Sequence, residues 1–356
     1  MDQPTAQNFD ATTALLINVA ARGAYDALPA KALHDTQLRL LDALTCALAA
    51  YEHPTSVLAR KSALRVSAVA PATVWGSAIR TTPEQAAFTN GVMTRLLDIS
   101  DTYLGRSRGH PSDMISGLVA IAEAHRCGGR SLLGAIALAY DVYCSFAAAI
   151  DVNSLGWDQP VYSILGTVLG AGRLLRLTRE QMGHAIALAL APNMALAQSR
   201  RGHLSNWKGC AGANASRNAV FAAQLAMDGF TGPSAVFEGE GGLWEIIGHH
   251  EWLIPEGRFW ISETHIKALP VCYHGQSAVY AALNLRDQVK LDEIETIEVT
   301  AYKAAVAMMG KDANRWAPGT HETADHSMPF CVASALRDGE FNDHTFSSEQ
   351  IGRAHV

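Results

Sequence analysis

The sequence has no excess of positive charge. Only 17% of its 356 residues are charged, and 28 Lys and Arg stand against 34 Asp and Glu, which gives a formal net charge of −6. Proteins that bind nucleic acid or an anionic membrane surface generally present a basic face. The charge balance therefore argues against both partners. An anionic ligand would have to be bound by a local group of cationic side chains.

Paired cysteines and export signals are also missing. The six cysteines are scattered without a CxxC pair, as expected of free thiols in a reducing compartment. The first residues include early acids and contain no basic or long apolar stretch, so no leader peptide is evident. The apolar stretches 131–150 and 179–195 are interrupted by charge or rich in Ala and Gly, which predicts buried helices rather than membrane spans. We expect a cytoplasmic protein.

Common metal and cofactor motifs are absent as well. There is no HExxH, and neither His249-His250 nor Cys272-Tyr273-His274 has the spacing of zinc ligands. No GxGxxG joins a strand to a helix, so a dinucleotide site is not predicted. We expect an active site that uses no cofactor and no metal.

Apolar residues recur at three- and four-residue spacing through the first three-quarters of the chain, which predicts helices. The predicted helices are Thr12–Ala21, Ala32–Ala50, Glu84–Leu97, Met114–His125, Ser131–Ile150, Val161–Leu175, Arg179–Ala195 and Gly212–Met227. Their composition is rich in Ala, Leu and Gly, and small residues let helix axes approach closely. The pattern predicts a compact multi-helix domain over residues 1–266.

The pattern changes after Trp260. Between 290 and 302, Ile297, Val299 and Ala301 alternate with polar residues, which predicts a half-exposed strand. Helices are predicted to begin near Gln276 and near 326–329, so residues 267–350 read as a partial α+β lid domain. The predicted fold class is therefore mainly α with a smaller α+β domain. Residues 351–356 match the translation of a common sequencing adapter, and we expect the natural chain to continue differently after Gln350.

Two aspartates end a predicted helix. Negative charge at a helix C-terminus is unfavourable by ~0.3–1 kcal/mol, so helix stability does not explain Asp98 and Asp101. One of these carboxylates could orient His110 or a lysine, or hold a proton during turnover.

The loop before the next helix carries Arg106, Arg108 and His110, followed by Ser112 and Asp113. Helix capping accounts for the serine and the aspartate, but it does not account for the histidine or the arginines. Two guanidinium groups and an imidazole beside a helix N-terminus can receive a carboxylate. The loop is therefore a candidate substrate-binding segment.

Two lysines complete the set. Lys208 lies at the start of a small-residue helix, where a cation opposes the helix dipole. Lys267 and His274 flank Pro270 across a predicted turn. Each could be an ordinary surface residue, and only the whole set suggests an active site for a small polycarboxylate.

The chain resembles the MmgE/PrpD family, which contains 2-methylcitrate dehydratases and cis-aconitate decarboxylases. The resemblance covers nearly the whole chain. It rests on Asp98–Thr102 with His110–Asp113, Trp207-Lys208 with Asn214, Ala215 and Arg217, Asp228–Pro233 with Phe237–Gly239, Lys267, Pro270, His274 and Gln276, and Asp325–Phe330.

The resemblance implies a large all-helical domain, a smaller α+β lid domain, a homodimer and a metal-free active site between the domains. It also implies a C-terminal return to the helical domain that is missing after Gln350. The catalytic candidates are Asp98, His110, Lys208, Lys267 and His274. The substrate-binding candidates are Asp101, Arg106, Arg108, Ser112 and Gln276.

Dehydrating a citrate-like molecule requires cations that neutralise its carboxylates and a group that moves a proton. We expect Lys208 and Lys267 to clamp carboxylates, His110 to transfer the proton and Asp98 to tune it. The sequence departs from the family where Phe330 replaces a frequent Tyr and where the loop 156–160 has no histidine. A hydro-lyase acting on a 2-methylcitrate-like substrate is the expected activity. A decarboxylase of a cis-aconitate-like substrate and a non-catalytic helical scaffold are the alternatives.

Overall fold

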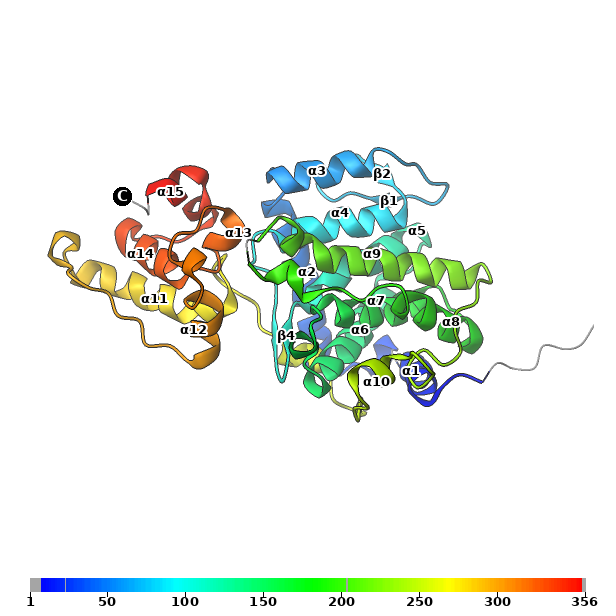
Figure 1. Ribbon diagram of the computed structural model, residues 1–356. Helices are drawn as coiled ribbons and strands as arrows, with labels where there is room; N and C mark the ends of the chain where they lie inside the picture. Colours follow the sequence, from blue (N-terminus) through cyan, green and yellow to red (C-terminus); the bar gives the residue numbers. More distant parts are fainter. Residues whose placement is uncertain (1–7, 23, 203, 354–356) are drawn as a thin grey trace, which may run out of the picture. The chain divides into compact units, whose positions relative to one another are not determined.

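The computed structural model describes residues 8–353 except 23 and 203 (Figure 1). Helices hold 61% of the residues and strands 4%, which confirms the predicted mainly α fold. The chain divides into two units, each described here by itself. Unit 1 comprises residues 1–96, 100–198 and 209–265, and unit 2 comprises residues 97–99, 199–208 and 266–356.

The helices of the first three-quarters follow the predicted pattern closely. They are α1 Ala11–Arg22, α2 Ala30–Ala49, α3 Pro54–Ala63, α4 Pro83–Arg95, α5 Ile115–Ala124, α6 Gly129–Ala149, α7 Pro160–Leu174, α8 Arg179–Leu190, α9 Trp207–Met227 and α10 Leu243–Ile247. Helix starts are fixed by local chemistry. Thr82 caps α4, and Thr178 forms a reciprocal capping box with Gln181 at α8. The prediction missed α3 and α10, and it extended α8 past its end at Leu190.

The core of unit 1 is built around α6 and α7 (Figure 1). A methyl group at Gly166 of α7 would lie 2.6 Å from the carbonyl oxygen of Ala139 in α6, so glycine is required where the two backbones approach. α6 is long and apolar enough to cross a membrane, but 72% of its apolar window is buried inside the protein. The helix therefore reads as a core helix, as the sequence predicted.

Unit 1 also contains two small antiparallel sheets of two strands each. β1 (Ala72–Thr73) pairs with β2 (Arg80–Thr81), and β3 (Tyr103–Leu104) pairs with β4 (Arg108–Gly109). Arg106 lies in the turn between β3 and β4, and Arg108 lies on β4 itself. The 3₁₀ helix Pro111–Met114 follows directly.

Unit 2 packs its helices around a separate core. They are α11 Gln276–Leu285, α12 Lys303–Met309, α13 His321–Ala324, α14 Met328–Asp338 and α15 Ser348–Arg353. α11 and α14 pack against each other, with Val279 and Ala335 fully buried (Figure 1). The sequence predicts both helices, one near Gln276 and one near 326–329. Of the six final residues, Ile351 is buried in this core, whereas 354–356 lie outside the described residues.

The strand predicted over 290–302 is not formed. Residues 294–302 have no regular secondary structure, and the amides of 295–301 donate no backbone hydrogen bond within the described part of the chain. A strand needs a neighbouring strand to pair with its backbone groups. The alternating side chains alone could not supply that partner.

Candidate active site

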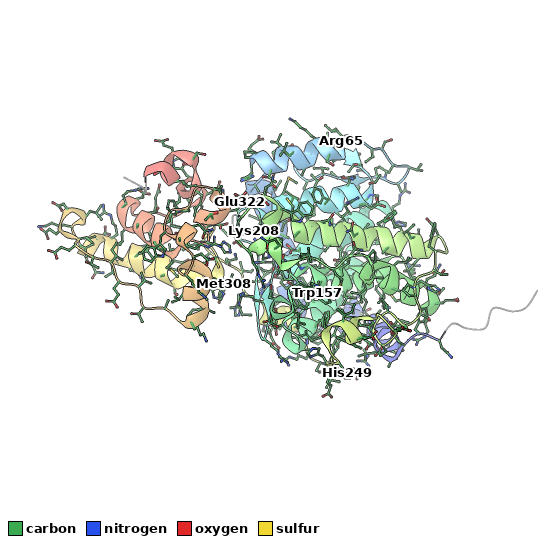
Figure 2. All side chains as sticks on the ribbon, in the orientation of Figure 1. Arg65, Trp157, Lys208, His249, Met308 and Glu322 are labelled. Atoms are coloured by element: carbon green, nitrogen blue, oxygen red, sulfur yellow. The ribbon has the colours of Figure 1, made fainter. Side chains whose placement is uncertain are left out.

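Three buried polar side chains meet in unit 2. Lys208 lies in the first turn of α9, and its Nζ is 2.8 and 2.7 Å from the two carboxylate oxygens of Asp325. The same Nζ is 3.0 Å from Nδ1 of His326 and 3.4 Å from the carbonyl oxygen of Glu322, the residue labelled beside Lys208 in Figure 2. Lys208 is only 4% exposed. Its charge is therefore held by the short segment from α13 into α14.

Asp98 and Lys267 extend this group. Nζ of Lys267 lies 2.7 Å from Oδ1 of Asp98 and also donates to the Asp98 carbonyl oxygen. The second carboxylate oxygen of Asp98 is 3.6 Å from both Lys208 Nζ and His326 Nδ1. We call Asp98, Lys208, Lys267, Asp325 and His326 the ionic cluster. Its two carboxylates balance its two ammonium groups when the imidazole is neutral.

The backbone brings Asp98 and Lys267 together although 169 residues separate them. Thr102 and His265 exchange two backbone hydrogen bonds of 2.8 Å, a few residues from each member of the pair. Asp98 itself has a φ of +49°, in the left-handed region that residues other than glycine enter at some cost and that aspartate enters more readily than most. Arg126 and Arg176 share this conformation, each with a φ of +54°, so the backbone alone does not mark Asp98 as functional. Here Lys267 holds the strained residue through both its main chain and its side chain.

The pKa values of Asp325 and His326 are shifted within the cluster. Burial by itself would raise the pKa of Asp325, but the charges of Lys208 and His326 outweigh it and lower that pKa. Burial and Lys208 both oppose charge on His326, yet Cys272 and Asp325 raise the pKa of the imidazole overall. The carboxylate therefore favours a charged imidazole beside it.

Cys272 is the neighbour of this pair. Its backbone N–H donates to the carbonyl oxygen of Asp325 at 3.0 Å. Burial would raise the pKa of the Cys272 thiol, but the charge of His326, a hydrogen bond to it and the charge of Lys267 lower it. The imidazole of His326 and the ammonium of Lys267 therefore favour the thiolate form of Cys272.

Asp98, Asp325 and His326 could also be considered as metal ligands, because one ligand atom from each lies within 4.8 Å of the others. The Lys208 ammonium is within 3.6 Å of ligand atoms of all three residues. A divalent ion would have to displace a cation that already satisfies both carboxylates. We therefore interpret the cluster as an ion-pair network of Lys208 and Lys267 rather than as a metal site.

Two predicted site residues of unit 2 have other partners. His274 accepts or donates a hydrogen bond at Nδ1 with the hydroxyl of Tyr302. The Gln276 amide nitrogen donates to the carbonyl oxygens of Leu269 and Val271 at 2.8 and 3.2 Å. Gln276 thus ties the loop that follows Lys267 to the start of α11.

The predicted residues between 101 and 112 belong to unit 1. The buried carboxylate of Asp101 accepts hydrogen bonds from the Ser112 amide at 3.0 Å and from the Tyr140 hydroxyl at 2.8 Å. Nδ1 of His110 lies 2.7 Å from the Asp101 carbonyl oxygen. These contacts orient the loop and present His110 at its end.

The two loop arginines are exposed in unit 1. Arg106 donates to the Ala149 carbonyl oxygen at 2.9 Å, and Arg108 lies on β4. Elsewhere in unit 1, a cavity of about 950 Å³ is lined by Arg126, Arg173 and Arg176 among others. Within the described residues, the ionic cluster brings two carboxylates and an imidazole together, those of Asp98, Asp325 and His326.

The sequence prediction did not assign Asp325, His326 or Cys272 to the site. The first two stand directly before Ser327, whose hydroxyl caps α14 by accepting the Phe330 amide at 3.1 Å. Two consecutive ionisable residues before a capped apolar helix were a usable signal. Phe330, which replaces a frequent family Tyr, is buried against Phe346 with ring centroids 6.0 Å apart.

Comparison of the sequence with protein-family profiles identifies the family of the chain. The profile of the MmgE/PrpD N-terminal domain matches residues 15–253, and that of the MmgE/PrpD C-terminal domain matches residues 269–356. The chain belongs to the MmgE/PrpD family.

Curated members of the MmgE/PrpD family are similar over most of the chain. The 2-methylcitrate dehydratase of Escherichia coli K12 is 28% identical over 358 residues, covering 91% of this chain and 72% of the relative. That of Cupriavidus necator is 27% identical over 360 residues, covering 95% and 74%. The mitochondrial 2-methylcitrate dehydratase of Yarrowia lipolytica is 24% identical over 347 residues, covering 89% and 65%. The relatives support a dehydratase-like function.

Proposed function

We propose that this protein is a hydro-lyase that removes water from a 2-methylcitrate-like polycarboxylate. The observation that carries the proposal is the ionic cluster, in which two buried lysines are held by Asp98 and Asp325 beside His326. The similarity to several 2-methylcitrate dehydratases supports the reaction class. The identity of the alkyl substituent is part of the proposal.

Dehydration breaks a carbon–hydrogen bond next to a carboxylate and a carbon–oxygen bond on the neighbouring carbon. Negative charge builds on that carboxylate as the proton leaves. A preorganised donor can stabilise such charge by about 3–4 kcal/mol. Lys208 and Lys267 supply such donors, because each ammonium is already fixed by a carboxylate and needs little reorganisation.

His326 and His110 are the candidates for proton transfer. Oδ1 of Asp325 lies 2.6 Å from Nδ1 of His326, which stabilises a proton on that nitrogen and orients the ring. His110 is oriented in the same way by the Asp101 carbonyl oxygen. A positioned acid or base contributes roughly 10²–10⁴-fold in rate. The experiment below assigns the roles by removing one imidazole at a time.

The remaining assignments stay predictions. They are catalytic roles for Asp98 and His274, substrate binding by Asp101, Arg106, Arg108, Ser112 and Gln276, a homodimer, and a cytoplasmic location.

The proposal is tested by turnover of 2-methylcitrate in the presence of a metal chelator, with five variants compared. Lys208→Met, Lys267→Met, His326→Ala and His110→Ala are expected to lower kcat by roughly 10²-fold or more. The control is Lys290→Met, which removes an exposed lysine of unit 2 paired with Glu293 at 2.7 Å. Unchanged turnover in a folded Lys208→Met protein would remove the ionic cluster from the mechanism. Unchanged turnover in His110→Ala would assign proton transfer elsewhere.

A further inference from the structure

Arg315 is a buried arginine without an anionic partner. It ends the 3₁₀ helix Ala313–Arg315 in unit 2 and is only 5% exposed. Its Nη1 makes one long hydrogen bond, 3.5 Å, to the carbonyl oxygen of Thr323, and its Nε has no hydrogen-bond partner within the described residues. No carboxylate in the described part of the chain lies within 4.0 Å of the guanidinium.

Other buried arginines of this protein face a carboxylate. Nε of Arg39 lies 3.8 Å from Asp101, and its guanidinium also donates to Thr264. Nε of Arg95 lies 4.0 Å from Asp113. Burying a guanidinium removes its hydration, and without an anion little replaces it. The burial of Arg315 is therefore offset only in part by its one long hydrogen bond to Thr323.

The backbone connects Arg315 to the ionic cluster. The guanidinium of Arg315 donates to the carbonyl oxygen of Thr323, and Lys208 Nζ lies 3.4 Å from the carbonyl oxygen of the preceding residue, Glu322. Two consecutive carbonyl groups of α13 therefore bond the two cations. The hydroxyl of Ser327 donates to the carbonyl oxygen of Arg315. The short segment from 322 to 327, which carries Asp325 and His326, is therefore bonded to Arg315 at both ends.

Charge balance distinguishes Arg315 from the two lysines. Lys208 and Lys267 are already paired with Asp325 and Asp98, whereas Arg315 adds a positive charge that no described carboxylate neutralises. A tricarboxylate brings three negative charges, and a cation without a carboxylate partner offers one of them an interaction beyond those of the two paired lysines. A planar guanidinium can bind a carboxylate through two parallel hydrogen bonds.

We propose that Arg315 is a substrate-binding residue whose guanidinium receives one carboxylate of a tricarboxylate ligand. The inference rests on the proposed function for the class of ligand, and it adds a binding residue. It explains why the fold keeps a buried cation that no described carboxylate pairs within 4.0 Å. It also assigns Arg315 to specificity, because a dicarboxylate that lacks the corresponding group would leave it unpaired.

The test is a binding cycle between protein and ligand, measured by titration calorimetry. The ligands are tricarballylate and two dicarboxylates that each lack one of its carboxylates, glutarate and methylsuccinate. Arg315→Met is expected to weaken tricarballylate binding by about 10- to 100-fold, the range of a charge-assisted hydrogen bond. At least one dicarboxylate should bind both proteins within about threefold. Arg315→Lys should recover part of the lost tricarballylate affinity, because lysine keeps the positive charge but cannot make two parallel hydrogen bonds to one carboxylate.

The matched control is Arg337→Met, which removes a unit 2 arginine whose Nε is 2.7 Å from Asp338. It should bind all three ligands like the unmodified protein. Urea unfolding supplies the second readout. Arg315→Met should be at least as resistant as the unmodified protein, because a buried unpaired charge has been removed.

Two results would overturn the inference. One is equal tricarballylate affinity in folded Arg315→Met and unmodified protein. The other is a large loss of resistance to urea together with equal losses for all three ligands, which indicates a structural role. Failure of the proposed function has a different signature. An unmodified protein that binds tricarballylate but leaves 2-methylcitrate unchanged refutes the dehydratase. The comparison of tricarballylate affinity between Arg315→Met and the unmodified protein still tests the role of Arg315.

Discussion

Replacing Lys208 by methionine should destabilise unit 2 far more than removing an exposed lysine. The Lys208 side chain is 4% exposed and bonds both oxygens of Asp325. Methionine fills similar space but leaves the buried carboxylate without its ammonium. Breaking a buried pair in this way costs about 3–5 kcal/mol. Lys290→Met removes a lysine that is 73% exposed and pairs with Glu293 at the same 2.7 Å, so its cost should be roughly 0.2–1 kcal/mol.

The assay is urea unfolding at pH 7, with hydrogen exchange of α11 and α14 to follow unit 2 separately. Two units need not unfold together, so a global probe alone would be ambiguous. The double variant Lys208→Met with Asp325→Asn should recover part of the loss, because it removes the carboxylate that the first change leaves unpaired. Equal costs for Lys208→Met and Lys290→Met would refute the burial argument.

The difference in unfolding free energy between the unmodified protein and Lys208→Met should depend on pH. The folded-state pKa of Asp325 is lowered by Lys208 and His326, against the opposing effect of burial. Its stabilising contribution is therefore present above the unfolded pKa of about 4 and is lost as pH falls through the lower folded value. The difference between the unmodified protein and Lys208→Met should shrink in acid, where Asp325 becomes protonated in both.

Other predictions concern unit 1. Burial raises the pKa of Asp141 to about 7 although its carboxylate accepts the Trp260 amide, so the folded state retains a proton between about pH 4 and pH 7 and holds an unfavourable buried charge above pH 7. Asp141→Asn should therefore stabilise the protein by about 2 kcal/mol at pH 8, after allowance for partial exposure, and by nothing near pH 4 in thermal unfolding. A methyl group at Gly212 of α9 would lie 1.9 Å from Oδ2 of Asp113, so Gly212→Ala should cost about 1–3 kcal/mol in urea unfolding. Gly129→Ala, where no atom lies within 4 Å, should be neutral or stabilising by up to ~1 kcal/mol, and equal effects of the two glycine changes would contradict the packing account.

Helices were predictable because their signals are local. The spacing of apolar residues and caps such as Thr82 and Thr178 determine where α4 and α8 begin. The predicted strand over 290–302 failed because strand formation depends on a partner that local alternation does not specify. The family itself was predictable from motifs that run along nearly the whole chain.

The site could be predicted only in part. Asp98 was identified because a carboxylate at a helix end is unfavourable, and the structure shows Lys267 as its partner. No sequence pattern indicates that contact, nor the backbone hydrogen bonds between Thr102 and His265 nearby in the sequence. Asp325 and His326 were missed as site residues because the segment around them was interpreted as a helix start.

The central claim is tested most directly by a proton NMR time course of the purified protein with 2-methylcitrate, citrate and cis-aconitate, in the presence of a metal chelator. The account predicts that 2-methylcitrate loses water and gives an alkene signal, and that folded Lys208→Met gives none at the same concentration. Loss of carbon dioxide from cis-aconitate without dehydration of 2-methylcitrate would contradict the dehydratase and support a decarboxylase. No change in any of the three compounds would contradict lyase activity on this class of substrate.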